Sequence, residues 1–149
     1  MFQHILIPTD GSPLSEKAIR AGVQLASQIG ARVTGFYAAD EYPVPPFGEY
    51  VPPDLLSPDE FRSNEETRAR KILAMVESIA SEQGVACGTD FAINYSPWQA
   101  IVKVAEAKGC DLIFMASHGR RGLASLLLGS ETNRVLTHTR IPVLVYRSP

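Results

Sequence analysis

At 149 residues, the chain is long enough to form one domain with a substantial hydrophobic core. Its composition, 45% hydrophobic and 20% charged, is typical of a soluble globular protein, and its net charge of -2 argues against nucleic-acid or acidic-membrane partners. We find no apolar stretch long enough to span a bilayer and no signal peptide before the first predicted strand, so we expect a cytoplasmic protein.

Short apolar runs that are predicted to be strands alternate with segments whose apolar residues recur at helical spacing. Ser12-Pro13 combines an N-cap with a proline at the first helical position, which indicates a helix start. The predicted strands are His4–Pro8, Arg32–Ala39, one within Cys87–Tyr95, Leu112–Ala116 and Ile141–Tyr146, and the predicted helices run from Ser12 to Gly30, Ser57 to Gly84, Ser96 to Gly109 and about Glu131 to His138.

Two of these helix starts share the signature of a capping box. Ser57 is followed three residues later by Glu60, and Ser96 is followed by Gln99 at the same spacing. The segment from Asp40 to Pro58 is different, because it holds six of the eleven prolines and no Lys or Arg. Such a segment is predicted to be extended, and it is either a flap over a ligand or a solvated connector.

Strands that alternate with helices over residues 1–149 predict a single α/β domain with a doubly wound, five-stranded parallel sheet of Rossmann-like type. For the strand order 3-2-1-4-5, the ligand crevice lies between the first and fourth strands. Those strands deliver Thr9-Asp10-Gly11 and Ser117-His118-Gly119 to the same edge of the sheet.

Gly129-Ser130 begins the last predicted helix, and free amides at a helix start bind anions such as phosphate. The sequence contains neither the P-loop GxxxxGK[ST], nor the dinucleotide motif GxGxxG, nor the nucleophile motif GxSxG. His118 has no carboxylate nearby in the sequence to orient it as a general base, so we assign no catalytic residue. An ordinary loop, in which Gly129 only separates two helices, is the simpler alternative.

Four stretches together resemble the universal stress proteins of the UspA superfamily, whose fold is that of the adenine nucleotide alpha hydrolases. They are Ile5–Ser12, Asp111–Arg120, Leu126–Ser130 and Pro142–Arg147. The ATP-binding branch of that family has the motif G-x2-G-x9-G-[ST]. Gly119, nine further residues and Gly129-Ser130 fit the motif, whereas Ala116 stands where the family has its first glycine.

The resemblance implies a site for ATP, ADP or AMP, with Mg²⁺ or Mn²⁺ held by the phosphates. In that site Asp10 lies near the ribose, Ala38 meets adenine through its backbone, and Glu131 either points away from the phosphates or shares a divalent ion with them. The full set of implied nucleotide-binding residues is Pro8, Thr9, Asp10, Ala38, Met115, Ala116, Ser117, His118, Gly119, Arg120, Gly129, Ser130, Glu131 and Thr132.

The family resemblance also implies a homodimer that is joined through the last strand. In this chain, Val143 and Val145 form an apolar edge on that strand. The function implied is ATP binding in a regulatory or stress-protective role, without rapid catalysis. Two alternatives stay open: a slow adenine-nucleotide hydrolase or transferase, and a dimeric interaction module that binds no nucleotide.

Overall fold

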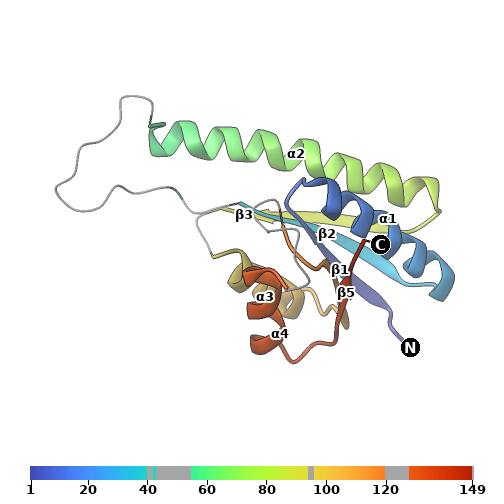
Figure 1. The fold of residues 1–149 in the computed structure, drawn as a ribbon. Coiled ribbons are helices and arrows are strands. Elements are labelled where there is room, and N and C mark those ends of the chain that lie inside the picture. The colour runs from blue at the N-terminus through green and yellow to red at the C-terminus, as the bar shows by residue number, and fades with distance from the viewer. Residues whose placement is uncertain (40–41, 43–54, 94–95, 120–127, 149) are drawn as a thin grey trace.

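The structure is a computed structural model and describes residues 1–39, 42, 55–93, 96–119 and 128–148. Within these residues, strands and helices alternate along the chain, as the sequence predicts (Figure 1). The elements are β1 (His4–Thr9), α1 (Pro13–Ile29), β2 (Arg32–Ala38), α2 (Pro58–Glu82), β3 (Cys87–Ala92), α3 (Pro97–Ala107), β4 (Leu112–Ala116), α4 (Ser130–His138) and β5 (Val143–Tyr146).

The five strands form one parallel sheet in the order β3-β2-β1-β4-β5, which confirms the predicted fold and strand order. Because all strands run the same way, their carboxyl ends meet at one edge of the sheet. The strand order reverses between β1 and β4, so the switch point lies where the sequence predicts it.

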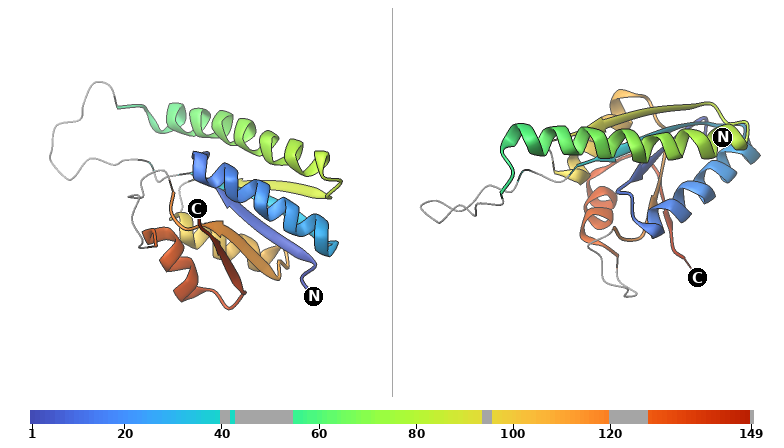
Figure 2. Two further views of the ribbon diagram at one scale, coloured as in Figure 1. Left: turned by 45° about the vertical axis from the view of Figure 1, so that its right-hand side comes forward. Right: turned by 90° about the horizontal axis from the view of Figure 1, so that it is seen from above.

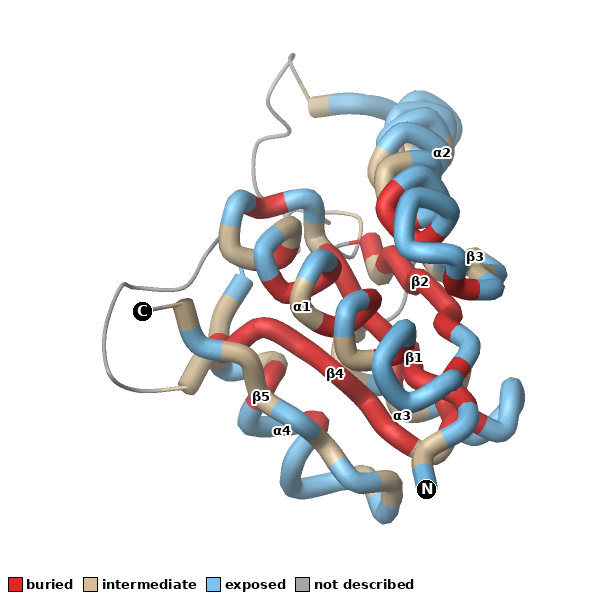
Figure 3. Tube along the Cα trace, turned by 90° about the vertical axis from the view of Figure 1, so that its right-hand side faces the viewer, coloured by how far each residue is buried: buried red, intermediate tan, exposed pale blue. Residues whose placement is uncertain are grey.

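Helices α1 and α2 cover one face of the sheet, and α3 and α4 cover the other (Figures 1 and 2). Side chains along β1 alternate between the two layers: Ile5 and Ile7 pack in the cluster beneath α1 and α2, and Leu6 packs in the cluster beneath α3 and α4. β1 and β4 are buried along their whole length (Figure 3), as expected of central strands in a doubly wound sheet.

The helix starts agree with the sequence in two cases and differ in a third. Ser12 and Ser57 are N-caps whose side chains accept from the amides of Ser15 and Glu60, each at 3.2 Å. Ser96 is the N-cap of α3, but its side chain makes no capping hydrogen bond, so the predicted capping box at Ser96 is wrong.

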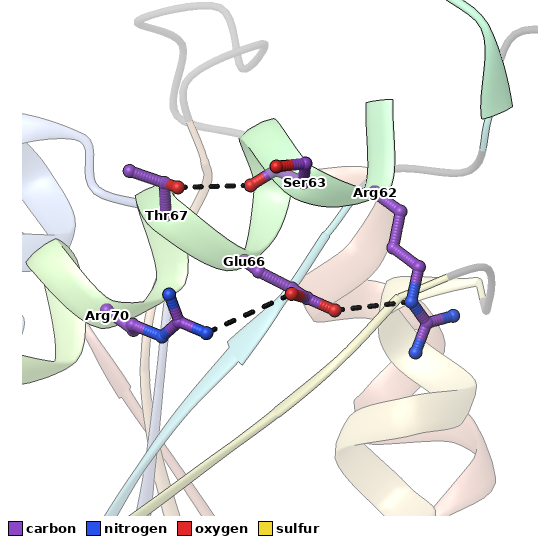
Figure 4. A network of polar contacts seen from close by, with 5 residues as sticks. All are labelled: Arg62, Ser63, Glu66, Thr67 and Arg70. Carbon is purple, nitrogen blue, oxygen red and sulfur yellow. Dashed lines mark hydrogen bonds and ion pairs between the residues drawn. The ribbon is translucent and has the colours of Figure 1, made fainter. Parts of the chain in front are cut away.

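The N-terminal end of α2 extends past the carboxyl edge of the sheet (Figures 1 and 2), and the first fully buried residue of this helix is Ala69. Around that point the helix carries pairs of charged side chains four residues apart. Glu66 accepts from Arg62 at 3.2 Å and lies 3.9 Å from Arg70 (Figure 4). Such exposed pairs contribute roughly 0.3–0.5 kcal/mol each to helix stability.

Three strand boundaries differ from the sequence prediction. β1 ends at Thr9 rather than Pro8, β2 ends at Ala38 rather than Ala39, and β5 begins at Val143 rather than Ile141. Pro142 contributes only its carbonyl, which accepts from Ile113 at 2.9 Å, because proline has no amide hydrogen to donate.

Most of the proline-rich segment, residues 40–41 and 43–54, lies outside the described residues. The choice between a flap and a solvated connector, which the sequence leaves open, therefore concerns residues that the structure does not describe. None of the described helices has the length and apolar character that crossing a bilayer needs.

Candidate functional site

β1 and β4 separate as they approach the carboxyl edge of the sheet. Their pairing is limited to Ile5 with Leu112 and Leu6 with Ile113, although both strands continue for three more residues. Pro8 lies in this unpaired part of β1 and has no amide hydrogen to give to a neighbouring strand. The separation opens the sheet at its switch point, which is where ligands of doubly wound folds bind.

Polar side chains in the turn after β1 form hydrogen bonds within that turn. The Thr9 hydroxyl contacts the Ser15 hydroxyl at 2.9 Å and accepts from the Gly11 amide at 3.2 Å. One carboxylate oxygen of Asp10 accepts from the Ser12 amide at 2.9 Å. Thr9 is only 6% exposed, so its side chain supports this turn rather than facing a ligand. Asp10 remains partly exposed at the carboxyl edge.

The turns that follow β1 and β4 lie against each other, as the sequence analysis predicts. A Cβ atom added to Gly119 would collide with Asp10 Oδ2. Gly119 is therefore glycine because the Asp10 carboxylate occupies the space of a side chain, and not because its backbone needs a left-handed conformation. Residues 120–127, which include Arg120, lie outside the described residues.

α4 begins immediately beside this contact and is tied to the end of β4 by two hydrogen bonds. The Gly129 amide donates to the Ser117 carbonyl at 2.8 Å, and the Thr132 hydroxyl donates to the Ala116 carbonyl at 3.0 Å. Gly129 and Thr132 are both among the residues that the resemblance implies at the nucleotide, and this structure shows the Gly129 amide and the Thr132 hydroxyl bonded within the protein. Both groups already have an acceptor in the protein.

The next amides of α4 are in a different position. In the described part of the chain, the amides of Ser130, Glu131 and Thr132 have no protein acceptor, and the N-cap Gly129 has no side chain that could cap them. The first amides of any helix lack intrahelical partners and carry the positive end of the helix dipole. This turn of α4 therefore presents three adjacent donors that an anion can bind.

The other described helices have a side-chain acceptor at their N-termini. Ser12 caps α1 and Ser57 caps α2. For α3 the acceptor comes from α4, because the Glu131 carboxylate accepts from the Trp98 amide at 2.8 Å. Glu131 thus supplies an acceptor to an amide in the first turn of α3, where the Ser96 side chain makes no capping bond. Of the four described helices, only α4 begins without a side-chain acceptor, either from its own N-cap or from another helix, for the amides of its first turn.

Glu131 follows one of its two predicted options, since its side chain points from α4 to α3. It also lies 3.7 Å from Arg134, and the Trp98 ring packs on the His138 ring with 4.2 Å between centroids. The sequence gives no local signal that places Trp98 at the site. For Ser15 the only signal is its capping spacing from Ser12.

No group of three or more His, Cys, Asp or Glu side chains suited to a metal ion occurs among the described residues.

The remaining predicted residues line the end of β4 and its neighbours. Ala116 is the last residue of β4, is 8% exposed and packs in the cluster beneath α1 and α2, so its methyl group is part of the core. Met115 packs on the opposite face together with Ala38. His118 is partly buried, and its Nδ1 lies 3.1 Å from the Ser117 hydroxyl.

The profile of the universal stress protein family matches residues 1–147, almost the whole chain. The chain belongs to the universal stress protein family. Universal stress protein MJ0531 of Methanocaldococcus jannaschii is 35% identical over all of this chain and 84% of its own length. Universal stress protein YxiE of Bacillus subtilis is 34% identical over 99% of this chain and all of its own length.

Solved structures of the family have the same fold. The structure of MJ0577, also from Methanocaldococcus jannaschii, superposes with a TM-score of 0.82 at 27% identity and covers 100% of this chain and 98% of its own. More distant family members, which show the fold alone, were solved in complex with cAMP (20% identity, TM-score 0.71), with dAMP from Archaeoglobus fulgidus (15%, 0.65) and with AMP bound from Arabidopsis thaliana (15%, 0.68).

Proposed function

We propose that this universal stress protein binds an adenine nucleotide in the crevice between β1 and β4, with ATP as the physiological ligand. The observation that carries the proposal is the start of α4, where the amides of Ser130, Glu131 and Thr132 have no acceptor in the described protein. Support comes from three family members that were solved with AMP, dAMP or cAMP. An adenine nucleotide is common to all three ligands.

The phosphates bind to amides in this proposal, and the nucleoside binds to the strand ends. An exposed helix N-terminus stabilises an anion by only about 0.3–1 kcal/mol through its dipole, so directed hydrogen bonds from several amides are needed. Asp10 is the acceptor for the ribose hydroxyls, because its carboxylate is partly exposed beside Gly119. Pro8, Ala38 and Met115 lie at the strand ends that border the adenosine.

The role that fits this site is regulatory or stress-protective. Among the described residues, the phosphates are bound in this proposal by main-chain amides and not by a charged side chain. Glu131 is bonded to the Trp98 amide, so a divalent ion that accompanies ATP is held by the phosphates themselves. The consequence is slow or absent turnover, and the bound nucleotide acts through its occupancy of the site.

The test is to denature the purified protein, identify released nucleotides by mass spectrometry, and titrate the stripped protein with ATP, ADP and AMP. The proposal predicts an adenine nucleotide in the extract and saturable binding of at least one of the three. It fails if the extract contains none and no titration saturates. Sustained multiple turnover of ATP that is lost in His118→Ala would replace it with the hydrolase alternative.

We also propose a homodimer through β5, which is an edge strand of the sheet. The carbonyls of Pro142 and Tyr146 accept from β4, so the intervening Val143 and Val145 direct their main-chain groups outward, away from β4. Val145→Pro removes one outward amide and leaves the β4 pairing intact. Light scattering is expected to show a dimer for the wild type and a monomer for this variant, and a monomeric wild type refutes the proposal.

A further inference from the structure

The carbonyl of Ala116 lies beyond the last residue pair of the β1–β4 ladder, so it has no hydrogen-bond donor from a neighbouring strand. The amides of Ile113 and Ser117 donate to the carbonyls of Pro142 and Tyr146, each at 2.9 Å, so main-chain groups of the odd-numbered residues of β4 face β5. The main chain of Ala116 therefore faces β1. The β1–β4 ladder has already ended at Leu6 and Ile113, so β1 does not supply a donor at this level.

The Thr132 hydroxyl takes the place of that missing donor. It lies 3.0 Å from the Ala116 carbonyl, and Thr132 is only 2% exposed. Buried carbonyl groups need a partner, and a hydroxyl one turn inside a helix supplies it here. Together with the 2.8 Å bond from the Gly129 amide to the Ser117 carbonyl, this bond ties the first turn of α4 to the end of β4 at two points.

These two bonds define the direction of the open amides. Gly129 and Thr132 are three residues apart, and Ser130 and Glu131 lie between them. A turn that is held at both ends cannot rotate about the helix axis without breaking one bond. The cost of arranging the amides is therefore met on folding, before any ligand binds.

We propose that Thr132 is a positioning residue of the nucleotide site, which orients the amides of Ser130 and Glu131 through its bond to Ala116 and does not itself bind phosphate through its hydroxyl. This inference rests on the proposed function, and it assigns Thr132 a role different from the one implied by the family resemblance. The hydroxyl belongs to the junction of β4 and α4, and only the amide of Thr132 faces the ligand.

The experiment compares Thr132→Val, which keeps the shape but removes the hydroxyl, with Thr132→Ser, which keeps the hydroxyl. Thr137→Val is the matched control, because the described contacts of the Thr137 hydroxyl all lie within α4: the carbonyls of Asn133 and Arg134, and Nδ1 of His138. Calorimetric titration with AMP and with adenosine separates the phosphate contribution from the nucleoside contribution. Thr132→Val is expected to weaken AMP binding by about tenfold or more, the value of one charge-assisted hydrogen bond, and to leave adenosine binding within about twofold.

Thr132→Ser and Thr137→Val are expected to bind AMP as the wild type does. The amide NMR signals of Ser130 and Glu131 decide between positioning and direct binding. They shift in ligand-free Thr132→Val if the hydroxyl positions them, and they stay in place if it is only a ligand, which overturns the proposal. If Thr132→Val does not fold, Thr132→Ala replaces it, and equal AMP affinities in Thr132→Ala and Thr132→Ser overturn the proposal.

The same titrations keep the two proposals apart. A wild-type protein that binds neither AMP nor adenosine refutes the proposed function. A wild-type protein that binds AMP, together with a folded Thr132→Val that binds it equally well, refutes only the positioning role.

Discussion

Replacing Gly129 by alanine tests the close packing of α4 on the turn after β4. The Gly129 backbone is extended (φ -62°, ψ 156°), so alanine introduces no backbone strain there. Its Cβ, however, would lie 3.0 Å from both Cα and Cβ of His118 and 3.3 Å from the Ser117 carbonyl oxygen. Carbon atoms in contact normally lie about 3.5–4.0 Å apart, so the turn must open by roughly 0.5 Å.

That movement acts on the site more than on the fold. Overpacking costs about 1–3 kcal/mol, and the loss of glycine's freedom in the unfolded chain returns about 0.4–1 kcal/mol, so Gly129→Ala should fold with a modest loss of stability. Displacing one amide from a phosphate costs about 1.5–3 kcal/mol, or roughly 10- to 150-fold in affinity. We expect this loss for AMP and not for adenosine in calorimetric titrations.

Gly88→Ala is the matched control. Gly88 lies in β3, and a Cβ atom there meets nothing within 4 Å. It should bind AMP as the wild type does. A folded Gly129→Ala variant whose AMP affinity stays within about twofold of the wild-type value would refute the reasoning, because the predicted displacement would then have no effect on the phosphate.

Three further predictions follow from the same region and from the opposite edge of the sheet. Gly119→Ala forces the Asp10 carboxylate to move, so AMP and adenosine affinities should fall together; unchanged adenosine affinity would remove Asp10 from the site. Burial lowers the pKa of His4 from 6.5, so the unfolded chain binds the proton more readily and stability is lost as the pH falls below 6.5. In chemical denaturation, the free energy of unfolding of His4→Gln should depend less on pH than that of the wild type, and identical pH profiles of the two proteins would contradict this. Glu131→Ala removes the acceptor at the start of α3 and should cost about 1 kcal/mol in the free energy of unfolding, more than Glu131→Gln, which keeps an acceptor.

The elements of the fold were predictable because their signals are local. A buried run such as Leu112–Ala116 reads as a central strand, and Ser12-Pro13 marks the start of α1 through residues that are adjacent in sequence. The rules for parallel α/β domains, together with the choice of the strand order 3-2-1-4-5, gave the order that the structure has. The crevice between β1 and β4 then placed Asp10 and Gly119 together, and the structure confirms that contact.

The hydrogen bonds that define the start of α4 were not predictable in the same way. Glu131 accepts from an amide 33 residues earlier in the chain, at the start of a helix where the sequence spacing predicts a local cap by Ser96 that does not form. Thr132 was expected at the nucleotide because of the family resemblance, whereas the structure shows its hydroxyl on the Ala116 carbonyl. That carbonyl needs a donor only because β1 and β4 separate, which is a property of the assembled sheet.

The proposed phosphate site consists of three amides at the start of α4, and NMR observes them directly. In a ¹⁵N-labelled, nucleotide-free protein, the signals of Ser130, Glu131 and Thr132 should shift on addition of AMP and much less on addition of adenosine, while the Trp98 amide, already bonded to Glu131, should shift little. Saturating AMP binding that leaves all three signals in place would contradict the account, because the phosphate would then be held elsewhere.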